Sequence, residues 1–421
     1  MQIFIKTVVV LTIALSSNAL FMLGINYLGA GGSPLEKIHP ALYLALFALS
    51  LVPLYRPKAS KNFRTSGTLV AAGAMLAAAI WLTVWAAISP FAGGELTVPF
   101  VTFVLPAALL ILFTRASNAT LEFIGAAVPL FLLANSLFGI VGSVTGVNIL
   151  PQTSGNVVIY DPRPTALLGH PLINSQITGV YLLYLVLTGV KRGFTPASIM
   201  LVGLHLAALL AFGGRSALAF AVLLAALYFI YKLYQSAITG NVRSLLSLGL
   251  LLALGAVAVP FALQAGVADV LFDRIADDRG SADTRLAAIQ MLSILNFDQW
   301  IMGVGPAQRF SMLTALNTPN GVESFPLALL INFGLPAMVL ITGTTFYALY
   351  RLAKPMGGVG HWLVVYFFLT SAASLSIGSK TTSLALFVIV LVALHVREAS
   401  AKETPKAYRA PAGSVPAGGA R

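Results

Sequence analysis

Cysteine is absent from this chain of 421 residues, and charged residues are scarce. Without cysteine the chain has no disulfide, no thiol nucleophile and no thiolate metal ligand. Asp, Glu, Lys and Arg make up 9% of the residues, whereas soluble globular proteins average about 25%. Hydrophobic residues make up 58%. This balance argues against a soluble globular protein.

Apolar runs near the length of a membrane-crossing helix recur along the chain, since a helix of about 20 residues spans the hydrocarbon core. We therefore expect an all-α, polytopic integral membrane protein with about twelve transmembrane helices. These helices form one transmembrane domain over residues 1–396, and the Ala-, Pro- and Gly-rich tail 397–421 is expected to be disordered. The expected spans are 4–26, 39–55, 66–89, 98–114, 119–141, 172–190, 196–213, 216–235, 244–265, 324–350, 359–377 and 381–396.

The distribution of Lys and Arg predicts the orientation. With the N-terminus in the cytoplasm, most basic residues of the short loops and of the tail lie on the cytoplasmic side, so both termini are expected there. Topology explains the net charge of +12 without any nucleic-acid partner. It does not explain a set of cations outside: Lys37, Arg163, Arg215, Arg274, Arg279, Arg285, Arg309 and Lys380.

One large outside loop, expected over residues 266–323, concentrates charge in a chain that has little of it. Arg274, Arg279 and Arg285 lie there among several aspartates, and a solvated salt-bridge surface accounts for some of them. Arg285 differs because it opens an amphipathic stretch suited to the membrane surface. Arginine also suits a bidentate grip on phosphate.

Two further outside segments carry candidate binding groups. The first runs from Arg163 to His170 and Pro171 and is followed by Asn174, Ser175 and Gln176 at a helix start. There the helix dipole helps to bind an anionic or sugar group, and an ordinary polar loop before a Pro-initiated helix is an equal alternative.

The second segment is Gly213-Gly214-Arg215-Ser216, a connection too short to carry Arg215 far from the bilayer. A snorkelling arginine is the alternative. We favour a functional arginine because the two glycines let the backbone approach a ligand closely.

Glu323 and Ser324 stand at the mouth of the expected tenth span. A carboxylate at a partly desolvated boundary can act as a general base. The alternative is a helix cap, with Ser324 as the N-cap and Glu323 favouring the helix N-terminus. His205 lies within a span, where an interhelical hydrogen bond is expected. The sequence contains no metal-ligand spacing and no phosphate-binding glycine motif.

These motifs, in this order, resemble the O-antigen ligase and Wzy-type polymerase family. The resemblance runs through Arg163 to Pro171, Gly214-Arg215-Ser216, and Arg285 followed by Gly303-Val304-Gly305. The family's ligases also carry a His, then Asn, Ser or Gln, then nine residues, then Gly. Here Glu323, Ser324 and Gly334 keep that spacing, with Glu in place of His.

The resemblance implies a metal-independent glycosyltransferase with a fold of the GT-C kind and no cofactor, acting at the periplasmic face of the cell inner membrane. Its donor is a polyprenyl-pyrophosphate-linked oligosaccharide, and its acceptor is a lipid-linked glycan or the lipid A core. Its environment is the membrane lipid, and a chain-length regulator is a further expected partner. Arg215, Arg285 and Glu323 are the expected catalytic residues, and Arg163, His170, Arg274, Arg279 and Ser324 the expected substrate-binding residues.

Because the histidine is a glutamate here, we favour a polymerase of O-antigen, capsule or exopolysaccharide units over a ligase that transfers glycan to lipid A core. A secondary transporter or flippase is the alternative from another class. Against it, few charged residues lie deep within the spans, and charge concentrates in one outside loop.

Overall fold

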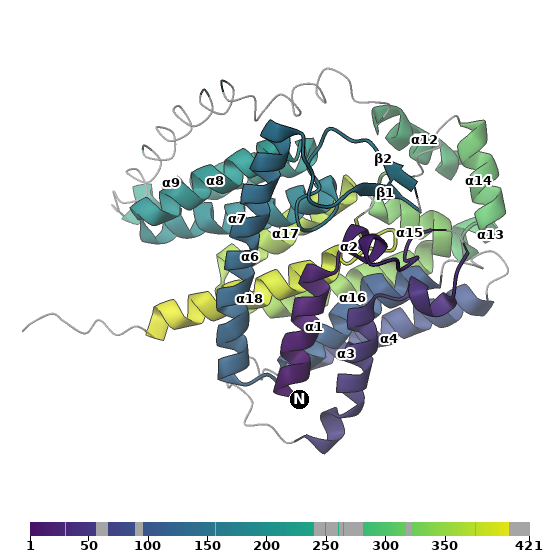
Figure 1. Cartoon of the computed structure of the whole chain (residues 1–421), viewed down its shortest axis with the longest axis horizontal. Helices are drawn as coiled ribbons and strands as arrows, with labels where there is room; N and C mark the ends of the chain where they lie inside the picture. Colours follow the sequence, from purple (N-terminus) through teal and green to yellow (C-terminus); the bar gives the residue numbers. More distant parts are fainter. Residues whose placement is uncertain are drawn as a thin grey trace, which may run out of the picture.

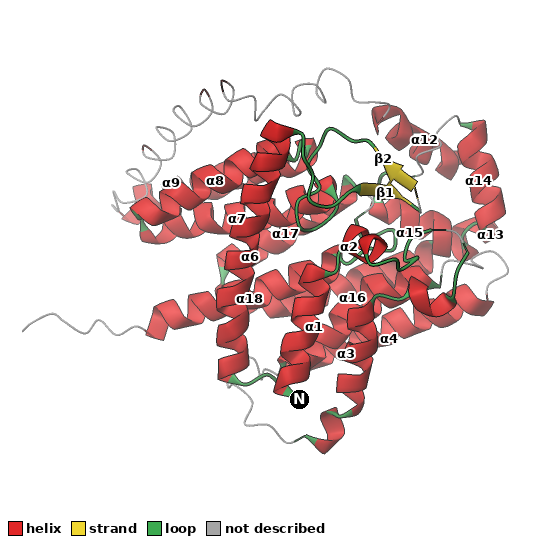
Figure 2. Cartoon of the chain, in the orientation of Figure 1, coloured by secondary structure: helices red, strands yellow, loops and turns green. Residues whose placement is uncertain are grey.

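A computed structural model of the chain describes residues 1–29, 31–55, 66–88, 96–155, 157–239, 281–316, 322–374 and 376–403, together with Gly249, Pro260 and Gln264. The described chain is helical apart from one hairpin, in which β1 (Gln152–Ser154) pairs antiparallel with β2 (Val157–Ile159) (Figures 1 and 2). The fold class is therefore all-α, as expected.

The described helices follow in chain order. They are α1 (Gln2–Ala14), α2 (Ser17–Met22), η1 (Pro34–Lys37), α3 (Pro40–Ser50), η2 (Val52–Leu54), α4 (Ser66–Ile88), η3 (Pro99–Val104), α5 (Leu105–Phe113), α6 (Asn118–Thr145), α7 (Pro171–Arg192), α8 (Pro196–Ala211), α9 (Arg215–Thr239), α12 (Ser281–Ile294), α13 (Phe297–Met302), α14 (Pro306–Ala315), α15 (Phe325–Phe333), α16 (Leu335–Ala353), η4 (Lys354–Met356), α17 (Gly358–Ala372) and α18 (Ser383–Glu403).

Within the described ranges, five helices are long and apolar enough to cross a membrane: α4, α6, α7, α9 and α18. Shorter apolar helices, α1, α3, α5 with η3, α8 and α17, stand at other expected spans. The architecture fits a helical membrane protein, but it does not establish twelve spans. Apart from Gly249, Pro260 and Gln264, the expected span 244–265 lies outside the described residues.

Two expected spans are each broken into two helices. Residues 4–26 form α1 and α2, and the second begins at an N-cap in which Ser16 Oγ accepts from Ala19 N. Residues 324–350 form α15 and α16, which meet at Gly334 with a φ of 85°. A β-carbon at Gly334 would lie 2.0 Å from the carbonyl oxygen of Ile301. The break therefore follows from a backbone-to-backbone contact that hydropathy does not register.

The last helix is longer than the sequence indicates. α18 continues to Glu403, beyond the expected boundary at 396, so residues 397–403 are helical rather than disordered. Residues 404–421 lie outside the described residues.

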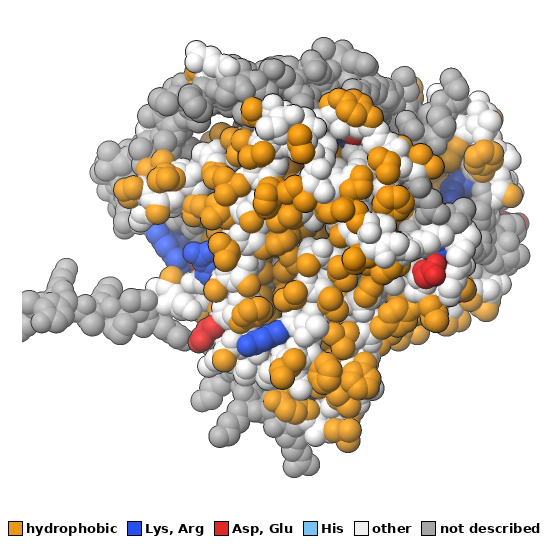
Figure 3. Space-filling view, in the orientation of Figure 1, with side chains coloured by type: hydrophobic (Ala, Val, Ile, Leu, Met, Phe, Trp, Pro, Cys, Tyr) orange, Lys and Arg blue, Asp and Glu red, His pale blue; other side chains and the backbone are white. Residues whose placement is uncertain are grey.

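The described helices place an apolar surface on the outside and polar groups inside. α7 lies within the bundle, where most of its residues are buried. It packs against α8, α9, α17 and α18. Large apolar side chains on α6 and α9 point outward, including Leu130, Val222 and Ile230, all at least 60% exposed. Figure 3 shows apolar side chains across the whole described face, with few charges between them. A surface of this kind suits lipid contact.

The bundle has two ends of different character. At one end α7 finishes at Arg192, which pairs with Glu398 of α18, and Gln2 beside the N-terminus bonds the α5–α6 connection. At the other end α7 starts at Pro171, next to a cavity. We call these the paired end and the cavity end.

Candidate functional site

A cavity of about 560 Å³ opens at the cavity end. Segments far apart in the sequence supply its lining: α2 and the loop after it, the hairpin, the starts of α7 and α9, α12, and the α17–α18 connection. Five of the expected site residues line it, namely Arg163, His170, Arg215, Arg285 and Glu323. Ser324 is not in the lining, and Arg274 and Arg279 lie outside the described residues.

Arg215 begins α9, and the two glycines before it decide where it sits. Gly213 has a φ of 64°, in the left-handed region that favours glycine. A β-carbon on Gly214 would lie 2.3 Å from Cβ of Ser175, so only glycine lets this turn rest against α7. The Arg215 side chain is half-buried, and no described residue forms a hydrogen bond or ion pair with its guanidinium. Among the described residues, the cavity thus contains a cation at a helix N-terminus without a carboxylate partner.

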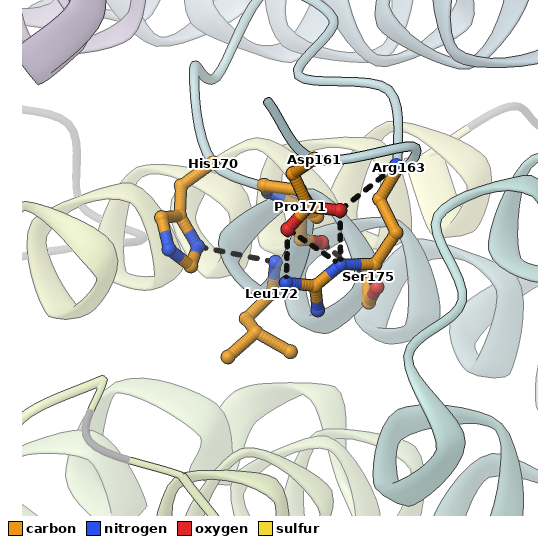
Figure 4. Close-up of polar contacts among 6 residues, drawn as sticks. All are labelled: Asp161, Arg163, His170, Pro171, Leu172 and Ser175. Carbon is orange, nitrogen blue, oxygen red and sulfur yellow. Dashed lines mark hydrogen bonds and ion pairs between the residues drawn. The ribbon is translucent and has the colours of Figure 1, made fainter. Parts of the chain in front are cut away.

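Arg163 is different, because its charge already has a partner. Its Nη2 lies 2.6 Å from Oδ2 of Asp161, and its Nε also donates to that carboxylate (Figure 4). Both side chains are largely buried, at 13% and 10% exposed. Burial alone would raise the pKa of Asp161, but the hydrogen bonds and charge of Arg163 hold that pKa below its usual value. A direct grip of Arg163 on an anion would have to compete with Asp161.

His170 is the N-cap of α7. Its Nδ1 accepts a hydrogen bond from Leu172 N at 3.2 Å (Figure 4). Burial, and then the charge of Arg163, lower the pKa of His170 to about 4. The ring is therefore neutral near pH 7, and with Nδ1 accepting, Nε2 carries the proton. In this state His170 can donate a hydrogen bond to a ligand.

Arg285 and Glu323 lie close together in the lining of the cavity. Nη2 of Arg285 lies 3.9 Å from Oε2 of Glu323 and donates to the carbonyl of Ala373 at 3.2 Å. Their side chains are 45% and 33% exposed, so both remain accessible to a ligand. The contact joins α12, the segment before α15 and the end of α17.

The capping alternative for Glu323 and Ser324 is not supported. Ser324 occupies the N-cap position of α15, but its side chain makes no capping hydrogen bond. Glu323 precedes the helix and is not in its first turn.

Gly303 and Gly334 allow close contact between α13 and α15, the short helix that follows Glu323. β-Carbons on Gly303 and Gly334 would collide with the backbone of Asn332 and of Ile301, respectively, so α13 and α15 touch through their main chains. Val304 N donates to the carbonyl of Ile331 at 2.6 Å in the same contact. The spacing between Glu323 and Gly334 thus corresponds to one short helix anchored at its far end.

The polar residues at the start of α7 form hydrogen bonds within the protein and do not line the cavity. Asn174 donates to the carbonyl of Thr165 at 2.5 Å, and Ser175 donates to that of Pro171. Gln176 donates to Ser371 at 2.7 Å and to Thr370 of α17. These three side chains are buried because α7 is surrounded by other helices. Hydropathy alone does not reveal that α7 is surrounded. His205 forms the expected interhelical hydrogen bond, 2.8 Å from Ser136 Oγ.

Sequence reasoning missed one wall of the cavity. The sequence identifies Lys380 only as one of the outside cations, whereas in the structure it lines the cavity beside Tyr27. Its Nζ donates to the carbonyl of Tyr27 and lies 3.8 Å from the centre of that ring. Around it the α17–α18 connection supplies hydroxyl side chains to the lining. The available signal was a hydroxyl-rich run, 374–383, between two apolar stretches.

Among the described residues, no group of three or more His, Asp and Glu side chains could hold a metal ion. Comparison with protein-family models and with curated proteins finds no match to this chain. Its chemistry must therefore be argued from the cavity itself. The cavity brings together Arg215, which has no carboxylate partner in the described part of the chain, a second accessible arginine and a carboxylate.

Proposed function

We propose that this protein is a glycosyltransferase that takes a polyprenyl-pyrophosphate-linked saccharide as donor. We further propose that it polymerises lipid-linked repeat units of an O-antigen, capsule or exopolysaccharide. The supporting observation is the gathering of Arg215, Arg285 and Glu323 in one cavity at the end of an apolar helical bundle. The resemblance to the O-antigen ligase and polymerase family points the same way.

In the proposed reaction, Arg215 grips the pyrophosphate of the donor. Its guanidinium has no partner among the described residues, so no ion pair must break before it binds. It also begins the long helix α9, whose N-terminal dipole favours an anion. Negative charge grows on the pyrophosphate as the bond to the sugar breaks, and a fixed cation stabilises that charge.

Glu323 is the proposed general base. The acceptor hydroxyl gives its proton to the Glu323 carboxylate, its oxygen forms the new bond to the anomeric carbon, and the polyprenyl pyrophosphate leaves with the electron pair. Arg285, 3.9 Å away, orients the carboxylate and reaches the donor phosphates from the other side. His170 contributes its Nε2 proton as a hydrogen-bond donor to the bound saccharide.

The cavity end belongs on the periplasmic side of the inner membrane in this proposal, and the paired end in the cytoplasm. Cysteines introduced by Ser281→Cys and Ser400→Cys in this cysteine-free chain test the orientation. An impermeant thiol reagent added to whole cells should label the first and not the second. The reverse labelling would overturn the orientation.

A deletion strain tests the function. Loss of polymer, with single repeat units still attached to the lipid A core, is the expected result. Loss of all attached glycan, with polymer retained on the carrier lipid, would identify a ligase instead.

Purified protein separates an enzyme from a transporter. Turnover of lipid-linked donor in detergent, without a sealed compartment, is expected. Failure with both lipid-linked and lipid A core acceptors would favour transport.

A further inference from the structure

The wall of the cavity that carries Lys380 is rich in hydroxyl groups. The α17–α18 connection contributes Ser374, Ser376, Ser379, Thr381 and Thr382 to the lining. Ser374 and Thr381 already donate to the carbonyls of Thr370 and Ser376, so their hydroxyl oxygens remain as acceptors. A wall of hydroxyl oxygens suits a ligand that is itself polyhydroxylated and can donate to them.

This wall is fixed by hydrogen bonds of its own. Thr102 Oγ1 donates to the carbonyl of Ser379 at 2.7 Å and accepts from Thr381 N at 3.2 Å. Ser383 Oγ donates to the carbonyl of Ser376 at 2.7 Å. These bonds attach the connection to η3 and to itself, so the hydroxyls are held in place before a ligand arrives.

Lys380 is a cation without a carboxylate. Its described contacts are the carbonyl and the ring of Tyr27, and no described Asp or Glu pairs with it. The facing titratable groups are Tyr27, His39 and Lys37, and none of these supplies negative charge near pH 7. A half-buried ammonium in this position is compensated best by a ligand that brings its own anion.

The Lys380 wall is separate from the arginines proposed to hold pyrophosphate. Arg215 stands on α9 against α7, whereas Lys380 stands against the loop between α2 and α3. Burial, and then Lys37, lower the pKa of Lys380 to about 8, so the neighbouring charge comes from that loop. Lysine is also a compact point charge, less suited than arginine to a forked grip on phosphate.

We propose that Lys380 and the hydroxyls of the α17–α18 connection form a saccharide subsite that selects a sugar bearing a carboxylate, such as a uronic acid. The carboxylate accepts from the Lys380 ammonium, and the hydroxyls bond the rest of the ring. This inference rests on the proposed function and adds the substrate class, an acidic repeat unit.

The test compares two tetrasaccharides that differ only at the carboxylate. They are β-1,4-linked tetraglucuronate and cellotetraose, in which each carboxylate is a hydroxymethyl group. Their affinities for the detergent-purified full chain are measured by calorimetry at pH 7 and fixed salt. The readout is the ratio of the two affinities, which does not depend on the fraction of protein that is folded.

Wild-type protein should bind tetraglucuronate more tightly, and Lys380→Gln should reduce the affinity ratio about 10–100-fold, as expected for one charge-assisted hydrogen bond. Lys354→Gln is the matched control, because Lys354 of η4 is an exposed lysine that does not line the cavity. It should leave the ratio within about twofold, since an exposed ammonium outside the site acts on it only through screened charge. Equal binding of the two sugars, binding of neither, or an unchanged ratio in Lys380→Gln would overturn the subsite.

Wild-type protein gives a second measurement if Lys380→Gln does not fold. Lys380 is protonated below its pKa of about 8 and loses its charge as the pH rises through that value. The ratio should therefore fall between pH 7 and pH 9, and a constant ratio would count against the subsite.

Geranyl pyrophosphate separates this inference from the proposed function. Its binding should weaken in Arg215→Lys and persist in Lys380→Gln. If geranyl pyrophosphate does not bind but tetraglucuronate does, the proposed donor is wrong while the acidic saccharide subsite stands.

Discussion

The two ends of the helical bundle differ in how their charges are paired, although each end has one ion pair with a largely buried carboxylate: Arg192 with Glu398, and Arg163 with Asp161. At the paired end, Glu398 is 2% exposed, and its Oε2 lies 2.5 Å from Nη2 of Arg192. Arg397 beside it donates to the hydroxyl of Tyr181 at 3.3 Å. At the cavity end, Arg215 and Lys380 have no carboxylate partner among the described residues, and Arg285 and Glu323 stay accessible.

This difference is the basis on which we propose a ligand for the charges of the cavity end. Removing an ion from water costs several kcal/mol unless a partner compensates it. At the paired end, Glu398 and Arg192 compensate each other's charge within the folded chain. The cavity end leaves part of the cost to be met by an anion, which is why we place the donor there.

The largest expected effect comes from Glu323→Gln, which keeps the shape of the side chain and removes the base. The rate of polymer formation should fall about 10²–10⁴-fold, measured by polymer per unit of inserted protein. Binding of geranyl pyrophosphate should be unchanged. Glu323→His should restore part of the rate, since the resembling ligases carry His there.

Near wild-type turnover in Glu323→Gln would contradict the base assignment. The proton acceptor would then be sought first at His170. That histidine is neutral near pH 7, but its free nitrogen already accepts from Leu172.

Arg215→Lys is expected to have the second largest effect. The substitution retains the positive charge and loses the forked geometry. Donor binding should weaken about 10–100-fold, as for a lost charge-assisted hydrogen bond, while the amount of protein in the membrane stays the same. Calorimetry with geranyl pyrophosphate gives the measurement, and unchanged affinity would show that Arg215 only reaches toward the membrane surface.

Gly334→Ala should act through the position of Glu323. An alanine there would keep a φ of 85° only with strain, and its β-carbon would lie 2.0 Å from the carbonyl of Ile301. The strain alone costs about 1–3 kcal/mol, so α15 should shift away from α13. We expect a lower melting temperature together with lower turnover. Gly343→Ala on α16 is the matched control, because its β-carbon would meet nothing within 4 Å; equal effects of the two substitutions would contradict this role.

Glu398→Gln is the matched counterpart of Glu323→Gln at the paired end and should affect activity least. It breaks the ion pair with Arg192, whose side chain is 37% exposed and can be solvated instead. The cost in stability should be about 1 kcal/mol or less, read from the melting temperature, with turnover within about twofold. A loss of turnover as large as that of Glu323→Gln would remove the distinction between the ends.

Local sequence patterns accounted for several features. Runs of apolar residues predicted helices, and α4, α6, α7, α9 and α18 stand close to their expected positions. The unusual placement of Arg163, Arg215, Arg285 and Glu323 singled them out, and they line one cavity. Composition and the positions of the few charged residues can be interpreted from the sequence without knowing any tertiary contact. Both reflect the free-energy cost of placing charge near lipid.

Other features depend on which segments touch. The break at Gly334 follows from the carbonyl of Ile301. The partner of Arg163 is Asp161, only two positions away, yet their side-chain pairing becomes visible only in the folded loop. The sequence around Gln176 likewise does not reveal its role. A polar residue at a helix start is compatible with a binding site and also with the buried hydrogen bond to α17 that the structure shows.

What the sequence determined by itself was the class of the molecule and its few exceptional charges. The scarcity of charge and the length of the apolar runs specify helices suited to lipid, whatever their packing. Tertiary structure alone decided which of those charges form ion pairs and which line the cavity. Lys380 joins the cavity because the loop after α2 folds against the α17–α18 connection, a contact between residues 353 positions apart. No local pattern encodes such a contact, because it depends on how the intervening helices pack.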